Sequence, residues 1–329
     1  MHQINRSIRI AGTGSFVPPR IVPNSELVGR VGSSEAWVLD NLGIRERRVV
    51  AEGVLTSDLA TAAAQNALKS AGLRPNDVDV IIVATATPDR SAPSTACIVQ
   101  HKLGIRCAGA FDINCACSGF VTAVDLASKY LNGEDYKRAM VIGTYAMSKH
   151  LDPDDSNASI LFGDGAGAFI LEYSPNQGLT ASTLKADGSF WDFMGIYGGG
   201  SAMPVDEKVL AERTHKVKVP KKFPATLNSE QWPPLIENTL AKIGLKPADA
   251  QAYVFTQIRK PTIVEVMEKF NLPMEKTHTI MEKWGYTGSA CVPMAFHDMA
   301  EQGKVKRGDR VVLCASGGGY SMACLTFIY

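Results

Sequence analysis

The segment at residues 110–131 places the strongest constraint on how this chain can fold. It reads AFDINCACSGF, followed without a break by VTAVDLASKYL. The apolar residues before Cys117 are typical of a buried strand, and those after it recur at helical spacing. The apolar face of that helix is formed by Phe120, Ala123, Val124, Ala127 and Leu131. The chain is therefore expected to turn from a strand into a helix at Cys117.

Cys117 is a candidate nucleophile because of this position. At the start of a helix, free N–H groups and the positive end of the helix dipole favour a thiolate over a thiol. Its small neighbours Ala116, Ser118 and Gly119 let a substrate approach the sulfur. A buried structural cysteine is the alternative interpretation, since free cysteines are among the most buried residues in proteins.

The composition limits the classes of protein to which the chain can belong. With 34 basic and 33 acidic residues, it carries no overall charge that would favour nucleic-acid or membrane-surface binding. No stretch approaches 18 consecutive apolar residues, and residues 1–6 lack the apolar core of a signal peptide, so we expect a cytoplasmic protein that does not enter a membrane. The seven cysteines lack metal-ligand spacing, so we expect a reducing compartment and no metal site.

The second half of the chain repeats the first in outline. Residues 252–255 resemble residues 80–83, and residues 285–293, which precede a helical pattern, correspond to the Cys117 segment. Two similar halves rich in βαβ units predict a five-layered α/β/α/β/α protein with a pseudo-twofold axis. We expect an N-terminal half at 1–175, an excursion or linker at 176–235 and a C-terminal half at 236–329.

The Cys117 segment also carries a family resemblance. The pattern Ala-Phe-Asp, four residues, Cys, a small residue, Gly-Phe closely resembles the active-site segment of β-ketoacyl-acyl-carrier-protein synthase III, a condensing enzyme of the thiolase superfamily. The resemblance implies a thiolase-like fold in which Cys117 takes an acyl group from coenzyme A, whereas Cys115 is a packing residue. The later sequence Ser-Gly-Gly-Gly-Tyr at 316–320 matches the family's Gly-Gly-Gly-Phe. It implies an oxyanion hole formed by the N–H groups of Gly318 and Cys117.

Further positions match the family's coenzyme A site. Trp37, followed by Gly-Ile-Arg-Glu-Arg at 43–47, resembles the adenine-stacking tryptophan and its signature, although Asn41 replaces an arginine common in the family. Lys149 and Arg259 are the cations we expect near coenzyme A, and Arg259 alternatively suits an anionic second substrate. The resemblance implies a homodimer in which a loop of one protomer walls the partner's acyl pocket. In that loop Ala92 replaces a bulky aromatic, which predicts a longer or bulkier acyl group.

Two positions depart from the family's catalytic pattern. The family uses a histidine in a Pro-His-Gln segment and an asparagine in a Gly-Asn-Thr segment to stabilise the carbanion formed when malonyl-carrier protein loses carbon dioxide. Thr256 stands at the first position and Tyr286 at the second. Threonine cannot become cationic, and hydroxyls are weaker donors than the groups they replace. The substitutions predict that ordinary decarboxylative condensation is impaired.

The sequence therefore predicts an acyltransferase that loads an acyl group from acyl-coenzyme A onto Cys117 and passes it to a second substrate. Acyl-coenzyme A is expected as a substrate, no separate cofactor is expected, and an acyl carrier protein is a candidate partner. The basic run at 215–222 is either a solvated surface or a rim that attracts coenzyme A phosphates or an acidic carrier. Two alternatives remain open: a true decarboxylative synthase with an unusual site, and a non-catalytic subunit paired with an intact synthase.

Overall fold

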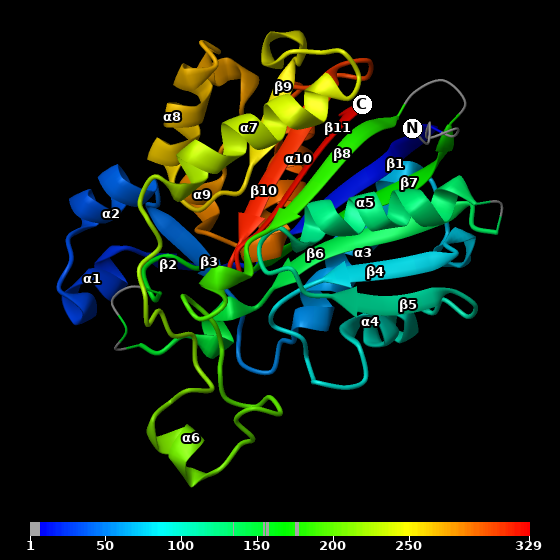
Figure 1. Cartoon of the computed structure of the whole chain (residues 1–329). Coiled ribbons are helices and arrows are strands. Elements are labelled where there is room, and N and C mark those ends of the chain that lie inside the picture. The colour runs from blue at the N-terminus through cyan, green and yellow to red at the C-terminus, as the bar shows by residue number, and fades with distance from the viewer. Residues whose placement is uncertain (1–6, 134, 154, 156–157, 175–177) are drawn as a thin grey trace.

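A computed structural model describes residues 7–133, 135–153, 155, 158–174 and 178–329 (Figure 1). The first sheet contains β1 (Ser7–Phe16), β4 (Val80–Ala84), β5 (Gly109–Ile113), β6 (Arg138–Tyr145) and β7 (Gly165–Ser174). Its strand order is β1-β7-β6-β4-β5, with β4 parallel to both of its neighbours. The sequence of β4 is VIIVA, and every residue is buried, as expected for a strand covered on both faces.

The second sheet has the same plan as the first. It contains β8 (Leu179–Ala186), β9 (Ala252–Phe255), β10 (Arg310–Gly317) and β11 (Ser321–Ile328). Its order, β8-β11-β10-β9, corresponds to β1-β7-β6-β4, with the same parallel and antiparallel pairings. The repeat predicted from the sequence is therefore confirmed at the level of strand order.

Helices separate and cover the two sheets. Helices α5 (Gly119–Asn132) and α10 (Cys291–Glu301) pack between them, since each contacts strands of both. Helices α3 (Thr56–Ala71) and α4 (Thr95–Leu103) cover the outer face of the first sheet, and α7 (Leu227–Ala241) and α8 (Lys260–Lys269) that of the second (Figure 1). The predicted five-layered α/β/α/β/α fold is thus confirmed.

Smaller elements surround one end of these layers. They are β2 (Arg20–Pro23), α1 (Ser25–Val31), α2 (Glu35–Leu42), β3 (Glu46–Val49), α6 (Glu207–Ala211) and α9 (Met281–Trp284). Figure 1 shows α6 on a segment that extends away from the body of the molecule. Within the described ranges, no helix combines the length and apolar character needed to cross a membrane.

The boundaries expected for the three regions differ from those of the structure. The excursion expected at 176–235 includes β8, which pairs with β11, and the first part of α7. Both belong to the C-terminal half, which therefore begins before residue 236. Sequence patterning missed this because β8 alternates weakly and the prolines of α7 look like loop signals. Residues 175–177, where one boundary was expected, lie outside the described residues.

The two halves meet through close backbone contacts at glycines. Gly143, in the middle of β6, faces the segment that leads into α10, and a Cβ atom there would lie 2.4 Å from the carbonyl oxygen of Ser289. The Ser289 hydroxyl donates a hydrogen bond to the carbonyl of Ala84 at 2.7 Å, on the neighbouring strand. The start of α10 is therefore held directly against the first sheet.

We expect Gly143→Ala to destabilise the protein by about 1–3 kcal/mol, because the added methyl group forces strand and helix backbones apart. Denaturant unfolding measures the loss. Gly29→Ala is the control, since a Cβ at Gly29 meets nothing within 4 Å, and its change is expected to stay below about 1 kcal/mol. Equal unfolding midpoints for the two variants would contradict this account of the contact.

Candidate active site

Cys117 lies in the turn between β5 and α5, as the sequence predicts. Ala116 adopts a φ of 47°, an unusual value for a residue with a side chain, and Ser118 is the N-cap residue of α5. The turn is held by hydrogen bonds just before the cysteine: the N–H of Ala116 donates to the Asn114 side chain at 3.0 Å, and the Ser321 hydroxyl donates to the carbonyl of Cys115 at 2.9 Å. The side chain of Cys117 is consequently held in one place and only 3% exposed.

Two cavities meet at Cys117. The first has a volume of about 190 Å³ and is lined, among others, by Asn228, Arg259, Tyr286 and Gly317. The second has a volume of about 220 Å³ and an apolar wall formed by Ala86, Ala116, Met147, Phe162, Met194, Ile196 and Val217. Cys117 and Gly318 line both. A thioester reaching the sulfur through the first cavity would have room for an apolar acyl group in the second, which is called the acyl cavity below.

The glycines at the end of β10 bring backbone against the nucleophile. A Cβ atom on Gly317 would lie 2.6 Å from the amide nitrogen of Cys117, so no larger residue fits there. A Cβ on Gly318 would meet nothing closer than the carbonyl oxygen of Met194 at 3.6 Å, which leaves this residue open to the cavities. The arrangement brings Gly318 beside Cys117, where the sequence predicts an oxyanion hole.

Among the described residues, the side chains that act on the pKa of Cys117 are tyrosines. Burial raises the pKa of Cys117 above the ordinary thiol value of 9.0, and hydrogen bonds from Tyr286 and Tyr145 lower it in part. Burial, together with the nearby Cys117, also raises the pKa of each tyrosine well above 10.0, so both hydroxyls keep their protons. This differs from the thiolate expected at a helix terminus, because burial is the largest influence on the pKa of Cys117 and favours the thiol.

Tyr145 was not predicted from the sequence. It ends β6, where its apolar context indicates a core residue, and it meets Cys117 only because β6 lies beside β4 in the sheet. Tyr286 was predicted, and its ring stacks on Phe162 with centroids 5.3 Å apart. The acyl-side residues Ile196 and Val217 were also missed, because they belong to a segment without recognisable periodicity.

Thr256 lies behind the site and not in it. Its hydroxyl accepts a hydrogen bond from the N–H of Ser316 at 3.0 Å and donates to the carbonyl of the same residue at 3.4 Å. The residue is 1% exposed and is not among those that line the two cavities at Cys117. Its contacts are those of a structural residue that joins the ends of β9 and β10.

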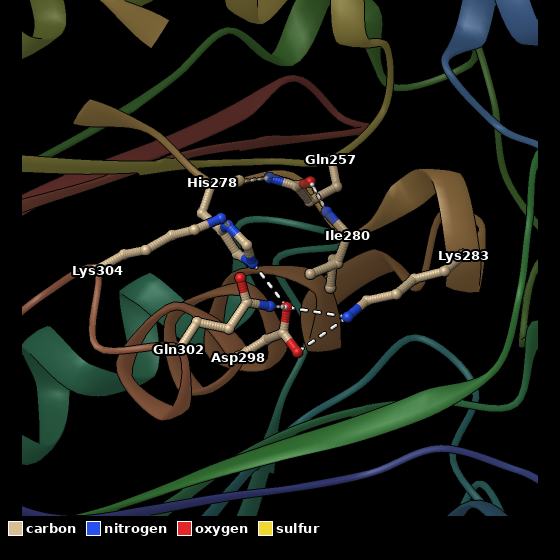
Figure 2. A network of polar contacts seen from close by, with 7 residues as sticks. All are labelled: Gln257, His278, Ile280, Lys283, Asp298, Gln302 and Lys304. Atoms are coloured by element: carbon tan, nitrogen blue, oxygen red, sulfur yellow. Dashed lines mark hydrogen bonds and ion pairs between the residues drawn. The ribbon is translucent and has the colours of Figure 1, made fainter. Parts of the chain in front are cut away.

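A polar network holds the segment that leads to Tyr286 (Figure 2). The side chain of Gln257, just after β9, donates to the carbonyl of His278 at 3.2 Å and accepts from the N–H of Ile280 at 2.9 Å. His278 contacts Asp298 of α10 at 2.6 Å, and Lys283 pairs with the same carboxylate at 2.9 Å. These bonds fix the path of the chain on either side of the site.

Arg259 and Trp37 lie along one chain of contacts at the first cavity. Arg259 lines that cavity, and its Nε donates to the backbone carbonyl of Asn41 at 3.3 Å. The Asn41 side chain in turn donates to the carbonyl of Trp37 at 3.0 Å within α2. Trp37 is 49% exposed, which leaves its ring free for a flat ligand. Arg259 is thus linked through Asn41 to the helix that carries Trp37, although Trp37 itself is not among the residues that line the first cavity.

Lys149 lies elsewhere. It lines a larger cavity of about 780 Å³, together with Arg20, Glu26 and Glu52, and the Phe162 ring is common to this cavity and the acyl cavity. The geometry therefore gives no support to the expectation that Lys149 shares a site with Arg259. Ala92 is exposed in the single chain and is not among the residues that line the acyl cavity.

Comparisons with known proteins agree with this geometry. The family described as 3-oxoacyl-[acyl-carrier-protein (ACP)] synthase III matches residues 111–188, and its C-terminal region matches residues 240–329. The beta-ketoacyl-[acyl-carrier-protein] synthase III of Methylococcus capsulatus is 36% identical over 97% of this chain and 98% of its own length.

Solved structures give the same result. The 3-oxoacyl-[acyl-carrier-protein] synthase III of Aquifex aeolicus superposes with a TM-score of 0.89 at 32% identity, over 98% of this chain and 100% of that one. The priming β-ketosynthase of the R1128 polyketide biosynthetic pathway gives a TM-score of 0.89 at 26% identity, over 98% and 96%. With the fold, the cysteine turn and these matches in agreement, the chain belongs to the 3-oxoacyl-[acyl-carrier-protein] synthase III family of the thiolase superfamily, a family of condensing and acyl-transfer enzymes.

Proposed function

We propose that this protein takes an acyl group from acyl-coenzyme A onto Cys117 and transfers it to a second substrate without ordinary malonyl decarboxylation. The observation that carries the proposal is the meeting of two cavities at one cysteine. The apolar cavity suits an acyl group, and the other is lined by Arg259, whose side chain bonds to Asn41 of the helix that carries Trp37. A thioester of coenzyme A combines an apolar acyl chain, a narrow pantetheine arm and an anionic nucleotide, which matches this order.

The chemistry follows from the residues at the sulfur. The thiolate of Cys117 attacks the thioester carbonyl, and the N–H groups of Cys117 and Gly318 are the donors available to the oxyanion. Collapse of this intermediate breaks the bond to coenzyme A and leaves the acyl group on Cys117. The second substrate then attacks the new thioester. No imidazole lines either cavity in the described structure, so a second substrate that is already nucleophilic suits the site best.

The first test is the location of the acyl group. After incubation with a panel of acyl-coenzyme A thioesters, intact-protein mass spectrometry is expected to show one added acyl group, and peptide mapping is expected to place it on Cys117. Cys117→Ala is expected to abolish the adduct. Cys115→Ala is the matched control, because Cys115 is not among the residues that line the cavities. An adduct on Cys115 would overturn the assignment.

Condensation with malonyl-carrier protein is expected to be slow. The hydroxyl of Thr256 is occupied by Ser316, and Tyr286 supplies one neutral donor in place of an amide. Losing a general acid–base group typically lowers a rate by ~10²–10⁴-fold, so we expect at least that deficit relative to a family member with histidine and asparagine. Release of labelled carbon dioxide from malonyl-carrier protein measures it. A rate equal to that of such a synthase would contradict this part of the proposal.

Arg259→Ala tests the coenzyme A side of the site. We expect the KM for acyl-coenzyme A to rise about tenfold, because one charge-assisted hydrogen bond to phosphate is lost. The KM for the matching acyl-pantetheine, which lacks the nucleotide, is expected to stay unchanged. Arg74→Ala is the control for loss of a guanidinium, since that side chain is 87% exposed and pairs with Asp77.

The same measurement on Lys149→Ala examines the second of the two expected cations, which lines another cavity. If Arg259→Ala left acylation intact and slowed only transfer to the acceptor, Arg259 would instead bind an anionic second substrate, contrary to its assignment to coenzyme A.

A further inference from the structure

The two tyrosines at Cys117 approach the sulfur from different cavities. Tyr286 lines the first cavity, Tyr145 lines the acyl cavity, and Cys117 is common to both. Each hydroxyl is close enough to the sulfur to lower the pKa of Cys117. The tyrosines come from different halves of the molecule, Tyr145 from the end of β6 and Tyr286 from the turn after α9. The sulfur is therefore held between two donors that the fold, and not the local sequence, brings together.

The position of Tyr145 depends on a specific glycine. Gly288 has a φ of +53°, and a Cβ atom there would lie 2.1 Å from Cε1 of the Tyr145 ring. The ring thus fills the space that the missing side chain leaves, two residues after Tyr286. This contact gives Tyr145 little freedom to turn its hydroxyl away from Cys117, because the residue is also only 2% exposed.

Among the described residues, two further ionisable groups lie near the sulfur: Arg259, which lines the first cavity with Cys117, and the buried thiol of Cys291 at the start of α10. Burial raises the pKa of Cys291, so it stays neutral, and its sulfur accepts a hydrogen bond from the N–H of Gln257 at 3.4 Å. Among the described residues, the groups that influence the pKa of Cys117 are the two tyrosines and its own backbone N–H, besides burial. Neutral O–H donors thus provide the side-chain stabilisation available to a thiolate here.

We propose that Tyr145 is a catalytic residue, which with Tyr286 forms a pair of hydroxyl donors that stabilises the Cys117 thiolate during acyl transfer. This inference rests on the proposed acylation of Cys117. The new bond joins the sulfur to the acyl carbon, and the bond between that carbon and the coenzyme A sulfur breaks. The proton lost by Cys117 ends on the departing coenzyme A sulfur, so the exchange is balanced. Tyr145 donates a hydrogen bond and keeps its own proton.

The test measures the thiol without any substrate. Iodoacetamide, a small neutral reagent, is applied across a range of pH, and the modified Cys117 peptide is quantified by mass spectrometry. A thiol reacts as its thiolate, so the rate rises about tenfold per pH unit until the pKa is reached. Because the hydroxyl lowers the pKa of Cys117, Tyr145→Phe is expected to shift this profile to higher pH by about one unit, or about tenfold in rate at fixed pH.

The variants keep the shape of the site. Phenylalanine retains the ring that packs on Gly288, and Tyr286→Phe is the corresponding change on the other side of the sulfur. Tyr253→Phe is the control. It removes a hydroxyl of β9 that donates to the carbonyl of Pro247, and Tyr253 is not among the residues that line the two cavities at Cys117. No shift of the profile is expected. Fluorotyrosine at position 145 is a stronger donor and is expected to shift the profile to lower pH. Unfolding curves confirm that each variant is folded.

The outcomes separate the inference from the function on which it rests. A profile unchanged by both Tyr145→Phe and the fluorotyrosine would overturn the role of Tyr145. A shifted profile with at least a tenfold slower acylation by acyl-coenzyme A would support it. If the profile shifts but wild-type protein forms no acyl-enzyme with any thioester, the hydroxyl pair stands and the proposed acyl transfer fails.

Discussion

The site depends on the close approach of the Gly317 backbone to the turn that carries Cys117. The amide of Cys117 lies so near this glycine that a side chain on it would overlap backbone atoms. Gly143 and Ser289 make the corresponding contact on the other side of the central helices. Because these contacts join main chain to main chain, they leave little slack between the halves. The nucleophile, the glycine strand end and the segment bearing Tyr286 are consequently assembled in one relative position.

This assembly produces a neutral, largely buried site. Burial opposes ionisation of Cys117 and of both tyrosines, and the hydrogen bonds from the tyrosines recover part of the lost stability of the thiolate. An imidazole in this region could hold a proton and a positive charge, whereas a phenol with a raised pKa can only donate. Under the proposed function, the site therefore favours transfer of an existing acyl group over stabilisation of a carbanion.

The segment between the halves has a role that its composition hides. Residues 195 and 218 pair through backbone hydrogen bonds in both directions, and the N–H of Val217 bonds to the carbonyl of His150 at 2.8 Å. These contacts turn an irregular stretch into a wall of the acyl cavity, formed within one chain by Met194, Ile196 and Val217. The sequence analysis instead assigned the wall of the acyl pocket to the loop of a partner protomer that contains Ala92. The family resemblance covers that loop, but it does not cover the excursion expected at 176–235.

Local sequence patterns were enough to predict the strand-to-helix turn at Cys117, the repeat of strand order and the family, because these depend on local periodicity and on motifs contiguous in the chain. The sequence also pointed to Tyr286 and Arg259, which line the first cavity with Cys117. Tertiary structure alone decided that Tyr145 faces Cys117, that Thr256 bonds to Ser316, and that Lys149 lines a separate cavity. These outcomes depend on which strands lie side by side and on how deeply each group is buried. Strand neighbours and burial arise from packing between distant segments, which no local pattern records.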